Sequence, residues 1–118
     1  MSASVTIRRA EPADAGAIVE FQKRMAHETE ARELDDATVR AGVQHLFDVP
    51  ADGFYLVAVE DDRLVASLMI TTEWSDWRNG LYWWIQSVYV IASHRRKGIY
   101  KRLYAEVKRQ AEADPSIC

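Results

Sequence analysis

Cysteine is almost absent from this chain, because Cys118 is the only one among 118 residues. An intrachain disulfide is therefore excluded, and such sparing use of cysteine is typical of proteins from a reducing compartment. Long apolar runs are also lacking: no stretch approaches the roughly 20 residues that span a bilayer, and the N-terminus has no signal-peptide core. We therefore expect a cytoplasmic protein with no membrane partner.

Histidine, proline and glycine are scarce as well, with three, three and five residues respectively. The histidines are scattered without the spacing of a metal site, and no Ser/His/Asp or Cys/His arrangement can be assembled around them. No stretch rich in serine or glycine separates two regions, and no repeat appears. With 48% hydrophobic and 28% charged residues, the composition predicts one globular domain over residues 1–118, without a metal.

Positive charge is concentrated in one short stretch of an otherwise acidic chain. The net charge is −3, which argues against a protein that binds nucleic acid over its whole surface. A single basic site of a few residues suits one small polyanionic ligand better than a long duplex. We therefore expect a small phosphorylated ligand and no nucleic-acid partner. The basic residues of this stretch, which contains no acidic residue, are Arg95, Arg96, Lys97, Lys101 and Arg102.

The order of apolar periodicities predicts a mixed fold. Alternating or continuous apolar runs predict strands, and apolar residues spaced three and four apart predict helices. We expect an α/β fold, an α+β mixed sheet with central antiparallel strands flanked by helices, in the order β-α-α-β-β-β-α-(β). A polar loop over 74–80 would join the last two long strands, and 116–118 would begin a further strand. The expected strands are 5–8, 53–60, 64–72 and 81–91, and the expected helices are 13–31, 35–49 and 99–113.

The stretch from Gln86 to Leu103 carries the strongest functional signal. It runs from a β-branched and aromatic strand through a basic loop into an amphipathic helix, with Gly98 at the helix entrance. The first turn of a helix presents backbone N–H groups without partners and a partial positive charge. Cationic side chains at this end are unfavourable unless an anion offsets them, and glycine lets that anion approach the backbone closely. The stretch therefore predicts a phosphate-binding loop rather than an ordinary solvated helix end.

Residues 95–100, Arg-Arg-Lys-Gly-Ile-Tyr, resemble the R/Q-x-x-G-x-G/A signature of the GNAT superfamily of acyl-CoA-dependent N-acyltransferases. Residues 87–90, Ser-Val-Tyr-Val, resemble the fourth strand of that fold, and the predicted element order is the one with which the fold begins. The resemblance covers nearly the whole chain. One position departs from it, because Tyr100 stands where the family usually has glycine or alanine.

This resemblance implies transfer of an acetyl group from acetyl-CoA to the primary amine of a small molecule or peptide by direct attack. It also implies that the pyrophosphate lies on the loop and that the pantetheine pairs with the fourth strand, where a bulge opens a slot. A backbone N–H of that strand would polarise the thioester carbonyl. The residues expected to contact acetyl-CoA are Val88, Tyr89, Val90, Arg95, Arg96, Lys97, Gly98, Ile99 and Tyr100.

The general base is less clearly indicated by the residues. Some family members have a glutamate on the fourth strand, eleven residues before the motif, where this chain has Trp84. Glu28 and Glu73 are substitute candidates by proximity, and each has a plainer interpretation as an exposed charge. The tryptophans between 74 and 84 are expected to divide between core and pocket wall. The residues expected to bind the acceptor amine are Glu28, Trp77 and Trp84.

The family fold continues beyond the motif helix with a fifth strand, a helix that carries a general-acid tyrosine, and closing strands. Here Pro115 follows the helix and the sequence ends at Cys118, so we expect an incomplete catalytic domain. The fourth strand would then expose an apolar edge along 83–90, which favours pairing with a second copy as a homodimer. Two functions remain open: an N-acetyltransferase, and an acyl-CoA-binding module or inactive fragment without turnover.

Overall fold

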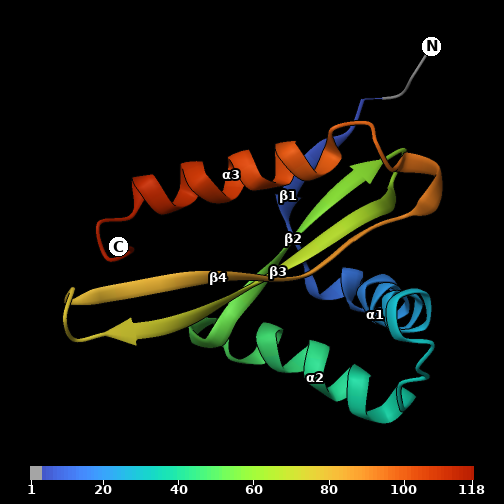
Figure 1. Ribbon diagram of the computed structural model, residues 1–118, viewed down its shortest axis with the longest axis horizontal. Coiled ribbons are helices and arrows are strands. Elements are labelled where there is room, and N and C mark those ends of the chain that lie inside the picture. Colours follow the sequence, from blue (N-terminus) through green and yellow to red (C-terminus); the bar gives the residue numbers. More distant parts are fainter. Residues whose placement is uncertain (1–3) are drawn as a thin grey trace.

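The four strands of the sheet lie in the order β1-β2-β3-β4, and each neighbouring pair is antiparallel. The computed structural model describes residues 4–118. Helix α3 lies on one face of the sheet, and α1 and α2 lie on the other (Figure 1). This arrangement confirms the predicted fold class. The elements are β1 (Thr6–Arg9), α1 (Ala15–Glu30), α2 (Asp36–Asp48), β2 (Gly53–Glu60), β3 (Arg63–Ser75), β4 (Gly80–Val90) and α3 (Ile99–Ala113).

A short 3-10 turn, Pro12–Asp14, sets the start of α1. Asp14 is buried, and its carboxylate accepts two hydrogen bonds from the Arg8 guanidinium, at 2.7 and 3.1 Å, and one from the Glu11 N–H at 2.7 Å. Burial by itself would raise the pKa of Asp14, but these hydrogen bonds outweigh it and hold the pKa below its usual value. The ion pair therefore joins β1 to the beginning of α1.

Helix α2 begins and ends where its flanking residues predict. The Asp35 side chain accepts a hydrogen bond from the Thr38 N–H at 2.9 Å, which satisfies one free donor of the first turn. At the other end, Val49 closes the helix just before Pro50, which begins a second 3-10 turn. The boundaries expected from these residues are thereby confirmed.

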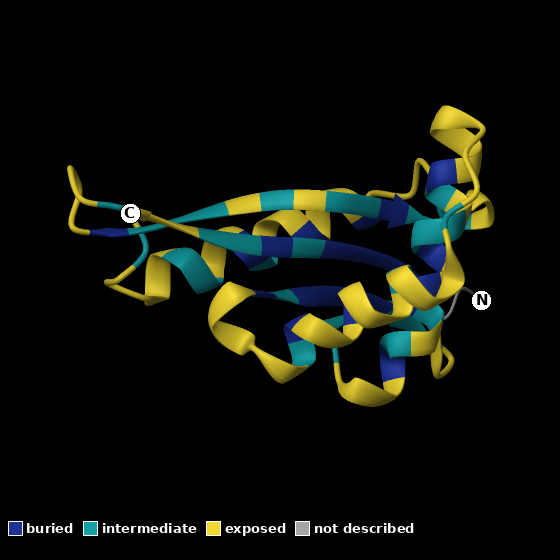
Figure 2. Ribbon diagram, turned by 90° about the horizontal axis from the view of Figure 1, so that it is seen from below, coloured by how far each residue is buried: buried dark blue, intermediate teal, exposed yellow. Residues whose placement is uncertain are grey.

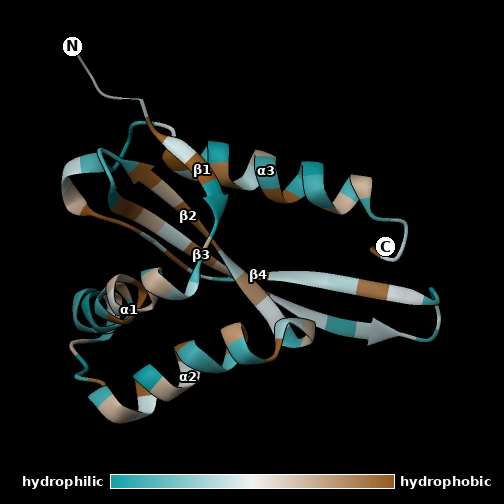
Figure 3. Cartoon of the chain, turned by 180° about the vertical axis from the view of Figure 1, so that it is seen from behind, coloured by the Kyte–Doolittle hydropathy of each residue, from teal (hydrophilic) through white to brown (hydrophobic). Residues whose placement is uncertain are grey.

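Two apolar layers hold the helices against the sheet, in which β2 is buried along most of its length and β3 mainly over 65–70 (Figure 2). Because side chains alternate across a strand, β2 contributes to both layers. Hydrophilic positions predominate along α3, and its hydrophobic positions recur on the side that faces the sheet (Figure 3). The layer under α3 includes Leu56, Leu68, Ile70, Ile99, Leu103 and Val107. The layer under α1 and α2 consists of Ile18, Val19, Val43, Leu46, Tyr55 and Val57.

The β3–β4 hairpin is longer than the sequence predicts. The expected polar loop over 74–80 is wrong at both ends, because Trp74 pairs with Leu81 and the turn is confined to 76–79. Aromatic residues favour a pleated, half-buried surface, so pairing continues where the polar neighbours suggested a loop. The end of the hairpin extends beyond the helices, and Trp77 at its turn is 96% exposed (Figure 1).

The last residues begin a new strand beside β4. Leu81 and Ile117 form one parallel bridge, in which the Leu81 N–H donates to the Ser116 carbonyl at 2.8 Å and the Cys118 N–H donates to the Leu81 carbonyl at 2.9 Å. The strand expected to begin at 116–118 is confirmed as this single bridge. It lies at the start of β4, far from the end that leads into the basic loop.

We predict that Leu103→Ala lowers the free energy of unfolding by about 2–5 kcal/mol, because truncating a fully buried leucine leaves a cavity. Leu103 holds α3 against the sheet, and urea denaturation followed by circular dichroism measures the loss. Glu112→Ala, on the exposed side of the same helix, is the control and should change stability by less than about 0.5 kcal/mol. Equal effects of the two substitutions would contradict this packing.

Candidate functional site

A β-bulge interrupts β4 shortly before its end. The pairing of β3 with β4 shifts between Ser67 and Met69, so that two residues of β4, Ser87 and Val88, oppose one residue of β3. Ser87 has a φ of +51°, in the left-handed region that few residues other than glycine adopt. A bulge bends its strand and increases the local twist. The bulge expected from the resemblance is therefore confirmed.

Beyond the bulge, β4 forms an open edge of the sheet. Within residues 4–118, the only bridge on its outer side is at Leu81, near the opposite end. An open edge offers backbone N–H and C=O groups to an extended ligand. One of these groups is already engaged, because the Val90 carbonyl accepts a hydrogen bond from Arg95 Nε at 2.8 Å. Val88 and Val90 therefore lie where the resemblance expects them, but the Val90 carbonyl also anchors the loop.

The loop after β4 is held at its beginning and open at its end. The His94 ring lies 3.0 Å from a Glu60 carboxylate oxygen and 2.8 Å from the Ser93 hydroxyl. Arg96 and Gly98 both adopt left-handed conformations, with φ of +64° and +79°. A Cβ at Gly98 would have no heavy atom within 4 Å. Glycine at position 98 therefore adopts the left-handed conformation without strain and leaves the space beside the backbone open.

The N-terminus of α3 opens into a hollow of about 390 Å³. Gly98 is the N-cap, and in the described part of the chain no side chain caps the first turn, which also lacks acidic residues. The free N–H groups and the helix dipole therefore favour an anion in the hollow. Arg102 is turned elsewhere, since its guanidinium donates to the Val5 carbonyl at 2.6 Å. The lining residues are Val90, His94, Arg95, Arg96, Gly98, Ile99, Tyr100 and Lys101.

The first arginine of the motif is held by α1. Arg95 donates to Glu28 Oε1 at 2.6 Å, and the Tyr89 hydroxyl donates to Glu28 Oε2 at 2.5 Å. The Arg95 guanidinium carbon lies 5.4 Å from the centroid of the Tyr89 ring, within the range of a cation–π interaction. Tyr89 also packs against Phe21 of α1, with 5.3 Å between ring centroids. These contacts join α1 to the end of β4 and to the loop.

Glu28 is an ionised carboxylate with both oxygens occupied. The hydrogen bond from Tyr89, followed by the one from Arg95, holds the pKa of Glu28 below its usual value of 4.5. A carboxylate with a lowered pKa is a weaker proton acceptor. The geometry therefore favours a role for Glu28 in positioning the loop, rather than its expected role as general base.

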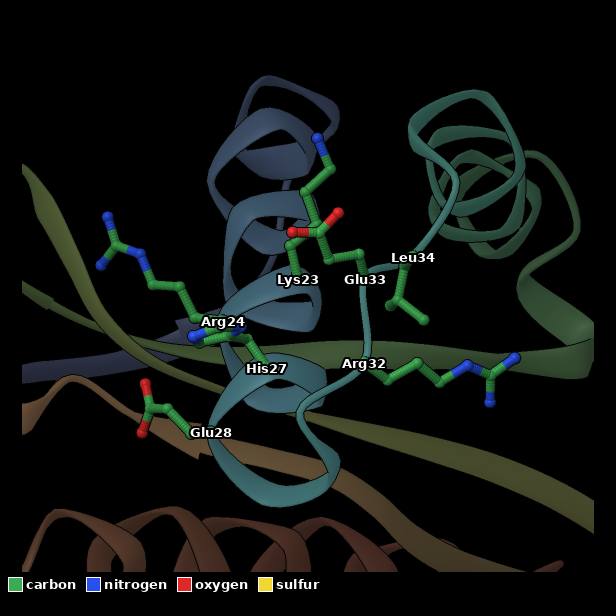
Figure 4. A pocket seen from close by; sticks show the side chains of 7 residues that line it. All are labelled: Lys23, Arg24, His27, Glu28, Arg32, Glu33 and Leu34. Carbon is green, nitrogen blue, oxygen red and sulfur yellow. The ribbon is translucent and has the colours of Figure 1, made fainter.

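A second hollow, of about 410 Å³, lies on α1 and the segment that leads to α2 (Figure 4). Glu28 lies at one side of it, which makes Glu28 a neighbour of this hollow as well as of the loop. Arg24 and Arg32 point away from one another (Figure 4), and Lys23 is held by Asp36. The basic side chains therefore do not converge on a common point. The lining residues are Lys23, Arg24, His27, Glu28, Arg32, Glu33 and Leu34.

A third hollow, of about 380 Å³, separates α1 from the bulge of β4 and is lined by residues of both, including Gln22, Ser87 and Val88. Gln22 Nε2 is buried and has no hydrogen-bond partner among the described residues. A buried amide donor without a partner is unfavourable unless a ligand or water satisfies it. Sequence reasoning missed Gln22, because a glutamine within an amphipathic helix carries no motif. Only the packing of α1 against β4 shows that it faces the bulge.

The residues expected to bind or activate the acceptor do not all lie together. The pairing register places Glu73 and Trp84 on one face of the sheet, the face that α1 and α2 cover. Trp84 is 50% exposed there. Trp77 lies at the hairpin turn, whereas Glu28 bonds to Tyr89 near the other end of β4. The structure therefore brings Glu73 and Trp84 to a common face and leaves Trp77 apart from Glu28.

Within residues 4–118, no group of three or more His, Cys, Asp or Glu side chains could hold a metal ion. Among the helices of that range, none is both long and apolar enough to cross a membrane.

We predict that Glu28→Gln loosens the loop over 92–98 without unfolding the protein, because the amide cannot form the ion pair with Arg95. The protection of the loop amides against hydrogen–deuterium exchange should fall severalfold. Glu30→Gln, at an exposed neighbouring glutamate, is the matched control and should leave the protection unchanged. Unchanged protection in Glu28→Gln would show that the loop does not depend on α1.

The same contact predicts a pH dependence. The pKa of Glu28 is lowered from its usual value of 4.5. The stabilisation that its carboxylate gives to the loop is therefore complete above pH 4.5 and is lost as the pH falls through the lowered pKa. Loop protection in the wild type, corrected for the intrinsic exchange rate, should therefore decrease on acidification. Glu28→Gln should not show this dependence.

Comparison with known proteins identifies the family. The sequence model of the acetyltransferase (GNAT) family matches residues 17–117. A possible acetyltransferase from Clostridium difficile 630 is 42% identical to this chain, with a TM-score of 0.91, and the match covers 97% of this chain and 75% of that one.

Two more distant structures share the fold. A predicted acetyltransferase from Clostridium acetobutylicum, solved with acetyl-CoA, is 18% identical with a TM-score of 0.77, and the match covers 98% of this chain and 79% of that one. Glucosamine-6-phosphate N-acetyltransferase from Arabidopsis thaliana is 17% identical with a TM-score of 0.73, and the match covers 98% and 80%. No curated protein matches the chain. The family match and the 42% identical structure together show that this chain belongs to the GNAT family of acetyltransferases.

Proposed function

We propose that this protein transfers an acetyl group from acetyl-CoA to the primary amine of a small molecule or peptide, by direct attack of the amine on the thioester. The observation that carries the proposal is a continuous path from the bulge at Ser87 and Val88, along the open edge of β4, to the uncapped N-terminus of α3. An extended chain that ends in a pyrophosphate fits this path, because the edge offers backbone hydrogen bonds and the helix end favours anions.

The loop would hold the pyrophosphate through its backbone and its free cations. Gly98, Ile99 and Tyr100 line the hollow, and the first turn of a helix has N–H groups without partners in the helix. Arg96, which also lines the hollow, and the exposed Lys97 next to it in the sequence would add positive charge. Arg95 has a different task, because Glu28 and the Val90 carbonyl already hold its guanidinium. We infer that Arg95 shapes the loop and contributes its backbone, while its neighbours neutralise the phosphates.

The bulge would position the thioester carbonyl of acetyl-CoA for reaction. A backbone N–H left free by the register shift at Ser87 and Val88 would donate to the thioester oxygen and stabilise the negative charge that develops there. The neutral amine attacks the carbonyl carbon, the C–S bond breaks, and the CoA thiolate leaves. The proton that the attacking nitrogen loses goes to a base or to water. Glu73 is not placed to accept this proton directly, because it pairs with Tyr82, several strand residues before the bulge. We therefore propose that water accepts the proton.

We predict that acetyl-CoA binds the wild type and that Lys97→Glu weakens this binding about tenfold, since a hydrogen bond to a charged group contributes on the order of 1.5–3 kcal/mol. Isothermal titration calorimetry measures both affinities. Arg63→Glu makes the same change of charge at an exposed position at the start of β3 and should leave the affinity nearly unchanged. An unaltered affinity in Lys97→Glu would remove the loop from the binding site.

Turnover is tested by the release of free thiol from acetyl-CoA in the presence of a panel of primary amines. Release that depends on the amine supports acetyl transfer. Tight binding of acetyl-CoA without amine-dependent release supports the alternative, an acyl-CoA-binding module.

The hollow beside the bulge is the proposed approach of the acceptor, with Gln22 as a hydrogen-bond donor to it. We predict that Gln22→Leu leaves stability unchanged or slightly higher, because it removes a buried donor that has no partner within residues 4–118. The acceptor KM should rise severalfold, while the affinity for acetyl-CoA stays the same. Thermal unfolding, calorimetry and steady-state kinetics with the best amine of the panel measure these quantities.

The matched control for this substitution is Gln44→Leu, at an exposed glutamine of α2. It should change neither the acceptor KM nor the affinity for acetyl-CoA. If Gln22→Leu weakened acetyl-CoA binding and left the acceptor kinetics unaltered, the acceptor would have to approach from elsewhere.

A further inference from the structure

Another hollow lies at the end of β2 that is remote from the loop. It has a volume of about 240 Å³ and lies where α2 ends and β2 begins, and we call it the α2–β2 pocket. The eight residues of β2 lead from this pocket to Glu60, which contacts the His94 ring, and a strand of that length spans roughly 25 Å. The pocket is therefore separate from the path proposed for acetyl-CoA. Its walls include Arg9, Ala10, Leu46, Phe47, Phe54 and Tyr55.

The pocket forms because β1 ends before it reaches the start of β2. Strand β1 pairs with residues 56–59 of β2. The Ala10 N–H still donates to the Tyr55 carbonyl at 2.9 Å, and the chain then turns into the 3-10 turn that precedes α1. Among the described residues, no strand therefore lies beside the beginning of β2 on this side, and the end of α2 borders the space instead.

Aromatic side chains form much of the wall of the pocket. The rings of Phe47 and Tyr55 lie with 6.1 Å between their centroids, within the range of an aromatic pair. Leu46 and Tyr55 are buried, while Phe47 and Phe54 are half-buried. Protein interiors are normally packed with few voids larger than a water molecule. A concave apolar surface of this size is therefore suited to an apolar ligand.

One cation lies beside this apolar wall. The Arg9 guanidinium carbon lies 3.7 Å from the centroid of the Phe54 ring, and Arg9 Nη2 donates to Gln110 Oε1 at 3.0 Å. Both partners are neutral, and within residues 4–118 Arg9 forms no ion pair, whereas its neighbour Arg8 is paired with Asp14. Arg9 therefore has a charge and further donors to offer to an anion, and its planar guanidinium matches a carboxylate.

We propose that the α2–β2 pocket binds a small aromatic carboxylate, a molecule of one ring and a short acidic chain such as phenylacetate. The ring would lie against Phe47 and Tyr55, and the carboxylate would bond to Arg9. The volume is below the roughly 300–1,000 Å³ of pockets for drug-sized molecules, which suits a single ring. One arginine balances one negative charge, which favours a carboxylate over a phosphate. The inference does not depend on the proposed function, because the pocket shares no residue with the loop or the bulge.

The test titrates phenylacetate into the isotope-labelled protein and follows the backbone amide signals by NMR. Saturable shifts are expected around the pocket, at residues such as Phe47 and Gly53, while the amides of the loop over 92–98 stay unchanged. Two fragments of the ligand are compared with it: phenethyl alcohol has the ring without the charge, and acetate has the charge without the ring. Each should bind at least about tenfold more weakly than phenylacetate, because each lacks one of the two contacts.

Two variants assign these contacts to residues. Arg9→Gln removes the cation, so it should weaken phenylacetate at least about tenfold and leave phenethyl alcohol unchanged. Arg63→Gln, at an exposed arginine of β3, is the matched control and should retain the wild-type affinities. Phe47→Ala should weaken phenylacetate and phenethyl alcohol by the same factor, because both lose the ring contact. Circular dichroism verifies that the variants are folded, and the comparison of ligands on the wild type does not depend on them.

Three results would overturn the pocket as a site for a small aromatic acid. The first is the absence of saturable shifts around the pocket with phenylacetate, benzoate and phenylpropionate. The second is an equal loss of phenylacetate and phenethyl alcohol in Arg9→Gln, which would indicate a structural role for Arg9. The third is a peptide ending in phenylalanine that binds more tightly than phenylacetate and loses affinity in Arg9→Gln, which would indicate that a protein terminus docks there instead.

Discussion

One extra residue in β4 divides this strand into two parts that differ in how their backbone groups are paired. Up to Gln86, β4 pairs in register with β3 and builds a long hairpin. After the bulge at Ser87 and Val88, the strand turns and its outer edge stays open within the described residues. The bulge therefore decides which backbone groups are used inside the sheet and which are left for a ligand. The loop, the hollow at α3 and the hollow beside α1 all adjoin this part of β4.

Only some of the basic side chains at the start of α3 bond to other groups of the protein. Positive charge at a helix N-terminus is unfavourable, and two of the five basic side chains avoid this cost by bonding to protein groups. Arg95 turns to Glu28 and to the Val90 carbonyl, and Arg102 turns to the Val5 carbonyl. The others remain exposed around the hollow. The charge that a ligand phosphate meets is therefore smaller and better defined than the sequence cluster suggests.

Helix α1 contributes to both sides of the site. Its inner face packs on the sheet through residues such as Ile18 and Phe21, which fixes its position relative to β4. From that position Glu28 reaches the loop and Gln22 reaches the bulge. The same packing that stabilises the fold therefore sets the distance between the proposed donor and acceptor regions. A substitution in the core under α1 would therefore shift side chains at both the loop and the bulge.

The sequence by itself determined the element order, the basic loop at the entrance of α3 and the family. These follow from local signals: apolar periodicity, the capping residue Asp35, and a glycine at the entrance of a basic helix. It did not determine the contacts between distant segments. Three features depend on how α1 and β3 dock against β4: the pairing of Glu28 with Arg95, the buried amide of Gln22 that has no partner among the described residues, and the true length of the hairpin near Trp74. A local pattern predicts which face of an element is apolar. Only tertiary packing decides which polar side chains come within hydrogen-bonding distance of one another.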